Sequence, residues 1–451
     1  MTNLEFNKSR VIFKIIDYAK GTNIYDQYCF FKSFLKKNQS NIQEYQTQRL
    51  KSLLIHAQQT VPYYHKVFSD INFNPNKFLN INTLNKIPIL ERETIRKFQD
   101  DLISNVYKKN KLNKSSSSGT TGIPINYFFD NKALSAGTAA GYMLWAMSGW
   151  NIGMRNVHIW GNESSIQRWE TIGSRFKNKI VNQINIASTL LNSEEKIREL
   201  SHQIKSNNPE IIDGYTSSIF SLAQYFKKEK IRLERLKLVL TTAENLENYQ
   251  KELIEEIFAQ IVDLYGSGKV LGIASKPAGD DKYYILDPHV IVETQDSGIS
   301  GMKDIIVTDL DNFAMPLIRY RLGDMIDDVN EPLPGNKYPF RWFTRVYGRS
   351  SEIITLPNGL KFHPVNIFGG TLFRKFDEIT RHKTIWDGKQ LHFIFEAANF
   401  NRYDELYNAL SKLLEPYKVI FKIDIAEKIL PSPSGKYKYM EILNPLKNAK
   451  T

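Results

Sequence analysis

The chain has 451 residues, of which 42% are hydrophobic and 24% charged, and its formal net charge at pH 7 is +12. This composition excludes a disordered chain, and the length exceeds one ordinary hydrophobic core, so two or more domains are expected. The single cysteine, Cys29, excludes an internal disulfide and a thiolate-rich metal site, and it fits a reducing cytoplasm.

The first apolar patch, at residues 11–16, is interrupted by Lys14, which predicts an amphipathic helix rather than a secretory signal. The excess of basic residues would attract nucleotides or an acidic membrane face, but the charges are dispersed and form no nucleic-acid motif. We therefore expect no nucleic-acid partner. Peripheral membrane contact through Arg10, Lys14 and Lys20 stays open beside the simpler interpretation of a solvated face.

Hydrophobic spacing predicts helices over the first 110 residues, for example where Leu50, Leu53, Leu54 and Ala57 recur at helical intervals. An uncharged stretch at 133–150 predicts a buried helix. Strand-like "NVHIWG", "EIIDGY" and "LKLVLTTA" then alternate with helical segments, which indicates parallel strands in an α/β layer. The chain becomes β-rich after about residue 280 and ends in a helix, "RYDELYNALSKLLEP", followed by alternating "VIFKIDIAEKI".

These elements predict an α/β fold with two domains. The large N-terminal domain, residues 1–347, would combine a helical part over 1–110, layered sheets and a β-rich subdomain. The small C-terminal domain, residues 348–451, would be a mobile α+β unit. No internal repeat or long low-complexity tract interrupts this organisation.

The segment "KSSSSGTTGIP" at 114–124 has the composition of a flexible linker, or of a loop that binds phosphate. A strand-like stretch, "INYFFD", and the uncharged helix follow it, which places the loop inside a fold. Its glycines let the backbone approach an anion and its hydroxyls donate hydrogen bonds without adding charge. It is not a Walker loop, and "GSGK" at 266–269 lacks the required spacing as well.

Six further motifs follow this loop in a fixed order: "DGYTSS", "TTAENL", "YGSGKVLGIASK", "RYRLGD", "YGRSSEIITLPNGLKFHP" and "LPSPSGKYKY". Together they resemble the adenylate-forming superfamily of acyl-CoA ligases, luciferases and peptide-synthetase adenylation domains. The chain looks most like the phenylacetate-CoA ligase branch and its CapK-like homologues from capsular polysaccharide loci. The resemblance covers almost the whole chain.

The resemblance implies roles for residues in each motif. Lys436 would be the catalytic lysine of adenylation, and Ser351 the hinge. Tyr215, Thr216 and Gly268 would line the acyl pocket. The residues implied to bind the nucleotide are Ser117, Ser118, Gly119, Thr120, Thr121, Gly122, Thr242, Ala243, Glu244, Tyr265, Gly266, Ser267, Asp324 and Arg349.

Each of these residues also has a simpler interpretation. Asp324 could cap a turn after its glycine, and Arg349 could form a surface ion pair. Tyr265 could be core packing rather than an adenine wall. Ala243 and Glu244 could begin the helix "ENLENYQKELIEEIF", where the helix dipole favours an acidic first turn.

The sequence departs from the family pattern at three positions. Lys269 stands where the Tyr-Gly motif normally ends in the Glu that holds Mg²⁺, so either another acid or water holds the metal, or Lys269 itself neutralises phosphate charge. Ser351 replaces the Asp that is common at the hinge. Ile125 replaces the Thr or Lys that often follows the loop proline. The metal ligand is therefore unassigned.

The resemblance implies a cytoplasmic AMP-forming ligase that uses ATP, Mg²⁺ and coenzyme A. It would adenylate a carboxylic acid and pass the acyl group to the CoA thiol or an amine, in cell-surface polysaccharide biosynthesis. The alternative is a catalytically degenerate homologue that binds a nucleotide or a partner. The acid, the acceptor and the oligomeric state are not defined by the sequence.

Overall fold

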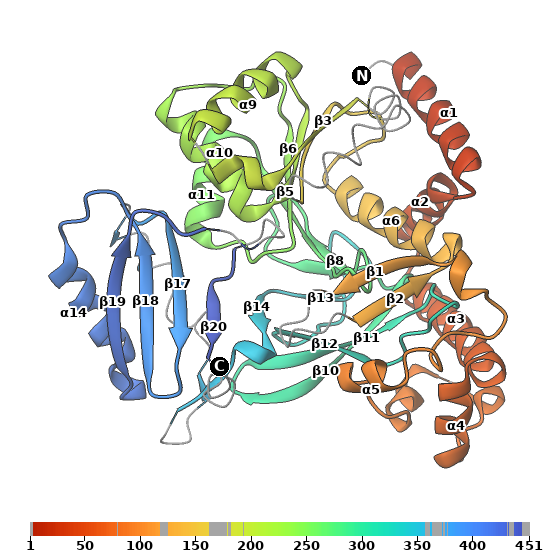
Figure 1. The fold of residues 1–451 in the computed structure, drawn as a ribbon. Helices are drawn as coiled ribbons and strands as arrows, with labels where there is room; N and C mark the ends of the chain where they lie inside the picture. Colours follow the sequence, from red (N-terminus) through yellow and green to blue (C-terminus); the bar gives the residue numbers. More distant parts are fainter. Residues whose placement is uncertain are drawn as a thin grey trace. The chain divides into compact units, whose positions relative to one another are not determined.

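The computed structural model describes residues 3–78, 80–117, 125–161, 178, 182–192, 194–356, 361–362, 372, 375–376, 378–430, 432 and 437–443. Two compact units make up the chain (Figure 1). Unit 1 contains residues 1–154, 262–296 and 301–346. Unit 2 contains residues 155–261, 297–300 and 347–451, so the C-terminal region packs with a central part of the chain.

Unit 1 begins with the predicted helices, which are α1 (Asn3–Lys20), α2 (Ile24–Ser33), α3 (Gln39–Thr60), α4 (Pro62–Asp70) and α5 (Arg92–Lys97). Short 3-10 turns lie between and after them at Phe34–Lys36, Pro75–Lys77, Ile81–Lys86 and Lys109–Lys111. The Asn38 side chain caps α3 by accepting a hydrogen bond from the Asn41 amide at 2.9 Å.

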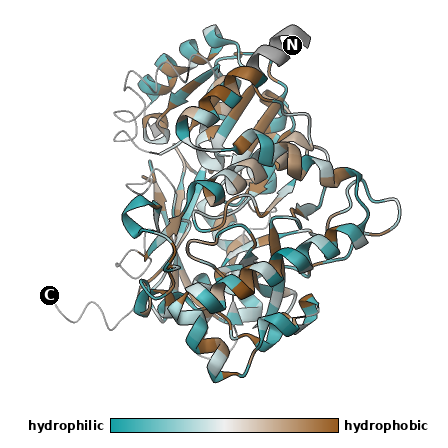
Figure 2. Cartoon of the chain, turned by 90° about the vertical axis from the view of Figure 1, so that its right-hand side faces the viewer, coloured by the Kyte–Doolittle hydropathy of each residue, from teal (hydrophilic) through white to brown (hydrophobic). Residues whose placement is uncertain are grey.

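The predicted hydrophobic stripe of α3 is confirmed, because Leu50, Leu53, Leu54 and Ala57 are fully buried. In Figure 2 the helices of this region carry hydrophilic and hydrophobic residues in alternation along their length, as expected where one helix face is buried. Among the described residues, no helix combines the length and apolar character needed to cross a membrane.

Three groups of strands complete unit 1. The first is the antiparallel hairpin of β1 (Asn113–Ser117) and β2 (Ile125–Phe129), followed by the uncharged helix α6 (Asn131–Ala146). The second, in the order β13, β9, β8, β7, contains Trp342–Phe343, Tyr283–Ile285, Ala274–Lys276 and Ile261–Tyr265. The third, in the order β10, β11, β12, contains Val290–Ile299, Met302–Asp309 and Tyr320–Ile326.

The central part of unit 2 is a parallel sheet in the order β4, β3, β5, β6, which confirms the predicted α/β layer. Its strands are Gln183–Ile186, Asn156–Ile159, Ile211–Tyr215 and Leu238–Thr242. A short turn at Ser188–Asn192 precedes the helices α9 (Glu194–Asn207), α10 (Thr216–Lys228) and α11 (Asn248–Ile257). These helices gather on one face of the sheet, where apolar residues of strands and helices form a common core (Figure 1).

The C-terminal part of unit 2 is the predicted α+β region. It starts with β14 (Val346–Arg349), the turn η6 (Ser350–Glu352), β15 (Ile354–Thr355) and β16 (Lys361–Phe362). A mixed sheet in the order β19, β18, β17, β20 contains Ile420–Ala426, Gln390–Glu396, Arg381–Trp386 and Met440–Ile442. The helix α14 (Tyr403–Leu414), with a 3-10 turn at Glu415–Tyr417, buries Leu406, Leu410 and Leu414 against this sheet.

Candidate functional site

The serine-rich loop joins two paired strands. Ser117 at the end of β1 is the register partner of Ile125 at the start of β2, and the Ser116 hydroxyl donates to Asn126 Oδ1 at 2.8 Å. The prediction that this segment lies inside a fold, rather than in a linker, is therefore confirmed at both of its ends. Its predicted nucleotide ligands Ser118, Gly119, Thr120, Thr121 and Gly122 lie outside the described residues.

Two predicted nucleotide motifs meet in unit 1. The Tyr265 hydroxyl, at the end of β7, donates a hydrogen bond to Asp324 Oδ2 in β12 at 3.0 Å. The Tyr265 ring is buried and packs edge-on against Phe343, with 6.0 Å between ring centroids. Tyr265 is thus part of the core, as the simpler interpretation held, and it also fixes the carboxylate of the "RYRLGD" motif.

The loop after Tyr265 folds back on itself. Ser267 Oγ accepts the backbone amides of Lys269 at 3.3 Å and Val270 at 3.2 Å, and the Ser267 amide donates to the Val270 carbonyl at 2.9 Å. A Cβ built on Gly268 would lie 3.3 Å from Ser115 Oγ, so the loop lies against β1. The predicted Gly266–Gly268 segment therefore borders the strand that leads into the serine-rich loop.

Lys269 is buried, with 7% of its surface exposed, and its Nζ lies 5.8 Å from the centroid of the Tyr320 ring. The Tyr320 and Tyr127 hydroxyls share a hydrogen bond at 3.1 Å, and burial raises the pKa of Tyr320. An ammonium group cannot coordinate a cation, and the Ser267 hydroxyl is occupied by backbone amides. The residues of this loop therefore do not fit the Mg²⁺ role that the family motif implies.

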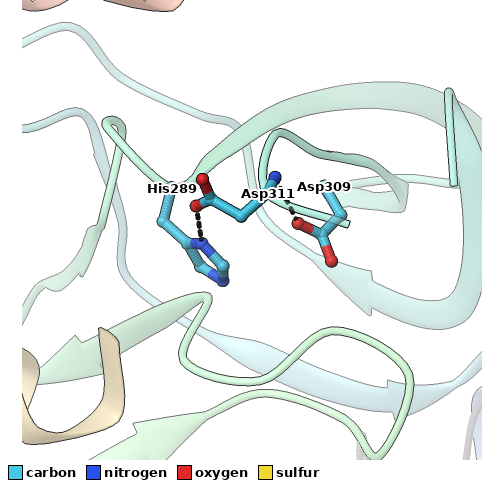
Figure 3. A group of neighbouring side chains, drawn as sticks. All are labelled: His289, Asp309 and Asp311. Atoms are coloured by element: carbon cyan, nitrogen blue, oxygen red, sulfur yellow. Dashed lines mark hydrogen bonds and ion pairs between the residues drawn. The ribbon is translucent and has the colours of Figure 1, made fainter. Parts of the chain in front are cut away.

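His289, Asp309 and Asp311 form a buried cluster in unit 1 (Figure 3). His289 Nε2 donates to the Leu271 carbonyl at 2.9 Å, and Nδ1 pairs with Asp311 Oδ2 at 2.7 Å. Asp309 Oδ1 accepts the amides of Asp311 and Asn312 at 2.9 and 3.3 Å. Burial alone would lower the pKa of His289, but the hydrogen bond to Asp311 and the two carboxylate charges raise it.

Both imidazole nitrogens of His289 are thus engaged, one of them as a donor to a carbonyl. A metal ion would have to displace Asp311 from Nδ1, so the group is better described as a charged pair that fixes Leu271. Arg49 extends this pair, because its Nη2 lies 3.1 Å from Asp311 Oδ1. Asp309 and Asp311 lie two positions apart at the end of a strand, and this spacing in the sequence could have indicated the cluster that they form with His289.

The predicted adenine loop is in unit 2. Ala243, immediately after β6, has a φ of +70°, a conformation that non-glycine residues rarely adopt and that recurs at ligand-binding loops. Glu244 Oε2 accepts the Ser217 amide at 2.8 Å, and the Thr216 hydroxyl donates to the Glu244 carbonyl at 3.4 Å. The helix that follows begins at Asn248 and is capped by Glu247. The interpretation of Ala243 and Glu244 as a helix start is therefore wrong.

The predicted acyl-pocket residues Tyr215 and Thr216 are buried at the end of β5 and the start of α10. The Tyr215 ring lies 4.4 Å from the Trp160 ring, and burial raises the pKa of Tyr215 to about 12. Asp213, on the same sheet face, accepts from Asn156 Nδ2 and pairs with His158 Nδ1 at 2.6 Å. Ligands of open parallel sheets bind at such carboxyl ends of strands.

The remaining predicted residues are in the C-terminal region. Arg349 is exposed at the end of β14, and Ser351 is exposed in the turn η6. Neither exposure decides between the predicted role and a surface role. Lys436, the predicted catalytic residue, lies outside the described residues, whereas the adjacent Tyr437 is described.

Comparison with known proteins gives the fold and its class. No protein-family model matches the chain. The crystal structure of 2-hydroxyisobutyryl-CoA ligase in a postadenylation state, with an acyl-AMP bound, has a TM-score of 0.71 to this chain at 13% identity. The alignment covers 92% of each chain. The chain therefore shares the fold of 2-hydroxyisobutyryl-CoA ligase.

Two relatives refine this class. The protein CapK of Staphylococcus aureus is 24% identical over 366 residues, which span 78% of this chain and 79% of CapK. A phenylacetate-coenzyme A ligase of Pseudomonas putida is 24% identical over 351 residues, which span 72% of this chain and 74% of that protein. In sequence the chain is thus similar to CapK and to a phenylacetate-CoA ligase over about three quarters of its length.

Proposed function

We propose that this protein is an ATP-dependent ligase that adenylates a carboxylic acid and then transfers the acyl group to the thiol of coenzyme A or to an amine. The observation that carries the proposal is the hydrogen bond from Tyr265 to Asp324, 59 residues apart in sequence. It joins the Tyr-Gly motif to the aspartate that would accept the two ribose hydroxyls of ATP. The approach of Gly268 to Ser115 supports the same assignment, because it brings β1, the strand that precedes the predicted phosphate loop, to this motif.

In the first step, an oxygen of the substrate carboxylate would attack the α-phosphorus of ATP, forming an acyl-adenylate and releasing pyrophosphate. Negative charge grows on the phosphoryl oxygens in this step, and the Lys436 ammonium would stabilise it. The hydroxyls of Ser117, Ser118, Thr120 and Thr121 would hold the phosphates. Arg349 would pair with ribose and phosphate, since its planar guanidinium binds such oxygens by two hydrogen bonds.

In the second step, the acceptor thiol or amine would attack the acyl carbonyl, lose its proton and release AMP. A swing of residues 348–451 about the segment at Arg349 and Ser351 would remove Lys436 before this step. Coenzyme A is the thiol that two of the comparisons carry in their names. The metal that accompanies the phosphates has no assigned protein ligand.

The place of this reaction in the cell is also a proposal. CapK is among the relatives, and the "PNGLKFHP" segment resembles the homologues from capsular polysaccharide loci. We infer a tailoring reaction of cell-surface polysaccharide biosynthesis, in which an activated acid is joined to an amine or a thiol. Fold alone does not fix a substrate, so this inference depends on the relatives.

A second candidate function is binding without turnover. The observation that favours it is Lys269, which replaces the motif's carboxylate and is buried above Tyr320. In that case the protein would bind ATP through the same residues but form no adenylate.

ATP–pyrophosphate exchange across a panel of aromatic, aliphatic, hydroxy and amino acids separates the two candidates. Label entering ATP with any acid shows reversible adenylate formation. Its absence with every acid, in a preparation that binds ATP by calorimetry, supports the binding protein. Absence of both exchange and ATP binding rejects both candidates.

A further inference from the structure

The carboxylate of Glu244 joins two segments that are far apart in sequence, both within unit 2. Its Oε2 accepts the Ser217 amide at the start of α10, at 2.8 Å, and its Oε1 accepts the Tyr437 amide at 3.1 Å. Each oxygen therefore has its own backbone donor. Hydrogen bonds to a carboxylate are roughly twice as strong as those between neutral groups. Tyr437 is the residue that follows Lys436.

Arg381, in β17, makes a second connection between the same two regions. Its guanidinium lies over the Tyr437 ring, 4.5 Å from the centroid, and donates to the Ser221 hydroxyl of α10. A hydrogen bond to Glu396 Oε1 at 2.7 Å holds the guanidinium in place. The Arg381 and Glu396 side chains are only 11% and 10% exposed, so water competes little for these contacts.

Packing around these polar contacts shows that the segment after Lys436 is docked on the α10–α11 region. The Tyr249 side chain packs against the C-terminal core. Tyr439 is half-buried, and burial of its hydroxyl near Gln250 of α11 raises its pKa. The Tyr439 carbonyl accepts the Thr384 amide at 2.8 Å, which ties the same segment to β17.

From this geometry we propose that Glu244 and Arg381 form a latch that holds Tyr437, the residue after Lys436, during adenylation. The latch holds Tyr437 to the start of α10 and to the loop that would bind adenine, and so fixes the chain next to Lys436. Glu244 and Arg381 are positioning residues and transfer no proton or group. The proposal rests on the proposed function, because a lysine that must leave before acyl transfer requires a connection that also opens.

The latch makes the two half-reactions respond in opposite directions. Adenylation needs the latch closed, so weakening it lowers the adenylation rate. Transfer to the acceptor needs the latch open, so weakening it leaves that step unchanged or makes it faster. A general folding defect would lower both, and a defect in nucleotide contacts would raise the KM for ATP.

The test uses the isosteric substitution Glu244→Gln and the substitution Arg381→Met, which keeps an unbranched apolar side chain but removes the guanidinium. The amide of Gln keeps one acceptor oxygen but presents an NH₂ group to the second backbone donor. Controls are Glu256→Gln, whose exposed carboxylate pairs with Lys227, and Lys196→Met, whose exposed ammonium pairs with Glu199 within α9. Adenylation is measured by pyrophosphate exchange, and transfer by adding coenzyme A or an amine to the chemically prepared acyl-adenylate.

We expect Glu244→Gln and Arg381→Met to lower kcat for exchange by about tenfold or more, with the KM for ATP changed less than about threefold. Transfer from the preformed acyl-adenylate should stay at or above the wild-type rate, and both controls should behave as wild type. Equal losses in both half-reactions, or a rise in the KM for ATP alone, would overturn the positioning role.

Hydrogen–deuterium exchange of the peptide over 437–443 tests the contact itself without any activity. Both latch variants should exchange this peptide about tenfold faster than wild type, and the controls should not. Unchanged protection would overturn the latch. If no acid supports pyrophosphate exchange, the proposed function and the catalytic role of the latch both fail, while the deuterium data still decide whether the contact exists.

Discussion

The Tyr265 hydroxyl donates a hydrogen bond to the Asp324 carboxylate at 3.0 Å and so holds it at one orientation on β12. If Asp324 binds the ribose hydroxyls, this orientation is part of the ATP site. Tyr265→Phe should therefore raise the KM for ATP by about three- to tenfold, the cost of one hydrogen bond to a charged group. Asp324→Asn should raise it further.

The matched control for Tyr265→Phe is Tyr284→Phe, which removes another tyrosine–aspartate hydrogen bond, at 3.3 Å to Asp280, in the same group of strands. Initial-rate kinetics at varied ATP measure both. If Tyr265→Phe and Tyr284→Phe have the same KM for ATP, the hydrogen bond of Tyr265 only stabilises the core.

Removal of the proposed catalytic ammonium should separate chemistry from binding. Lys436→Ala should lower the rate of pyrophosphate exchange by about 10²–10³-fold, because a positioned charge on the transition state is worth several kcal/mol. The Kd for ATP, measured by calorimetry, should change less than about threefold. Exchange at a near-normal rate would contradict the role of Lys436.

Lys269 gives a prediction about metal dependence. Lys269→Glu restores the carboxylate that the family motif carries and should lower the Mg²⁺ concentration that gives half-maximal exchange by about threefold or more. Lys269→Met removes the charge without adding a ligand and should lower exchange without that shift. Superimposable Mg²⁺ titrations of wild type and Lys269→Glu would show that residue 269 is remote from the phosphates.

His382 predicts a loss of stability in acid. Burial lowers its pKa to about 3, whereas the unfolded chain takes up the proton near pH 6.5. A group whose folded pKa is depressed in this way destabilises the fold as the pH falls below the unfolded value, by about 1.4 kcal/mol per pH unit. His382 packs against the Tyr439 ring, with 5.1 Å between centroids. Acid should therefore loosen the 437–443 segment.

Urea unfolding at pH 7 and pH 5 measures this effect. His382→Phe should remove most of the difference between the two pH values, and His65→Asn, at an exposed histidine, should leave it unchanged. A pH dependence that is the same in His382→Phe and wild type would assign the acid loss to other groups.

Local patterns predicted the elements well because each depends on neighbouring residues. The stripe from Leu50 to Ala57 required only helical spacing, and the parallel strand Ile211–Tyr215 only a short apolar run between helices. The start of α11 was misjudged because Glu247, not Glu244, forms the capping box with Gln250. Glu244 and Glu247 lie three positions apart, and in the sequence either of them is a suitable acidic residue for the start of this helix.

Contacts between distant residues could not be predicted in the same way. The charged pair of His289 and Asp311 depends on the turn that brings the ends of two strands together. The bridge from Glu244 to Tyr437 spans 193 residues and is set by how the C-terminal sheet packs on α10 and α11. Motif order assigned Tyr265 and Asp324 to one nucleotide, but the hydrogen bond between their side chains was not predicted.

The central claim is that this chain activates a carboxylate with ATP, and pyrophosphate exchange with the acid panel tests it most directly. The account predicts acid-dependent incorporation of labelled pyrophosphate into ATP by the wild-type protein and its loss in Lys436→Ala. No incorporation with any acid, or equal incorporation by both proteins, would contradict it.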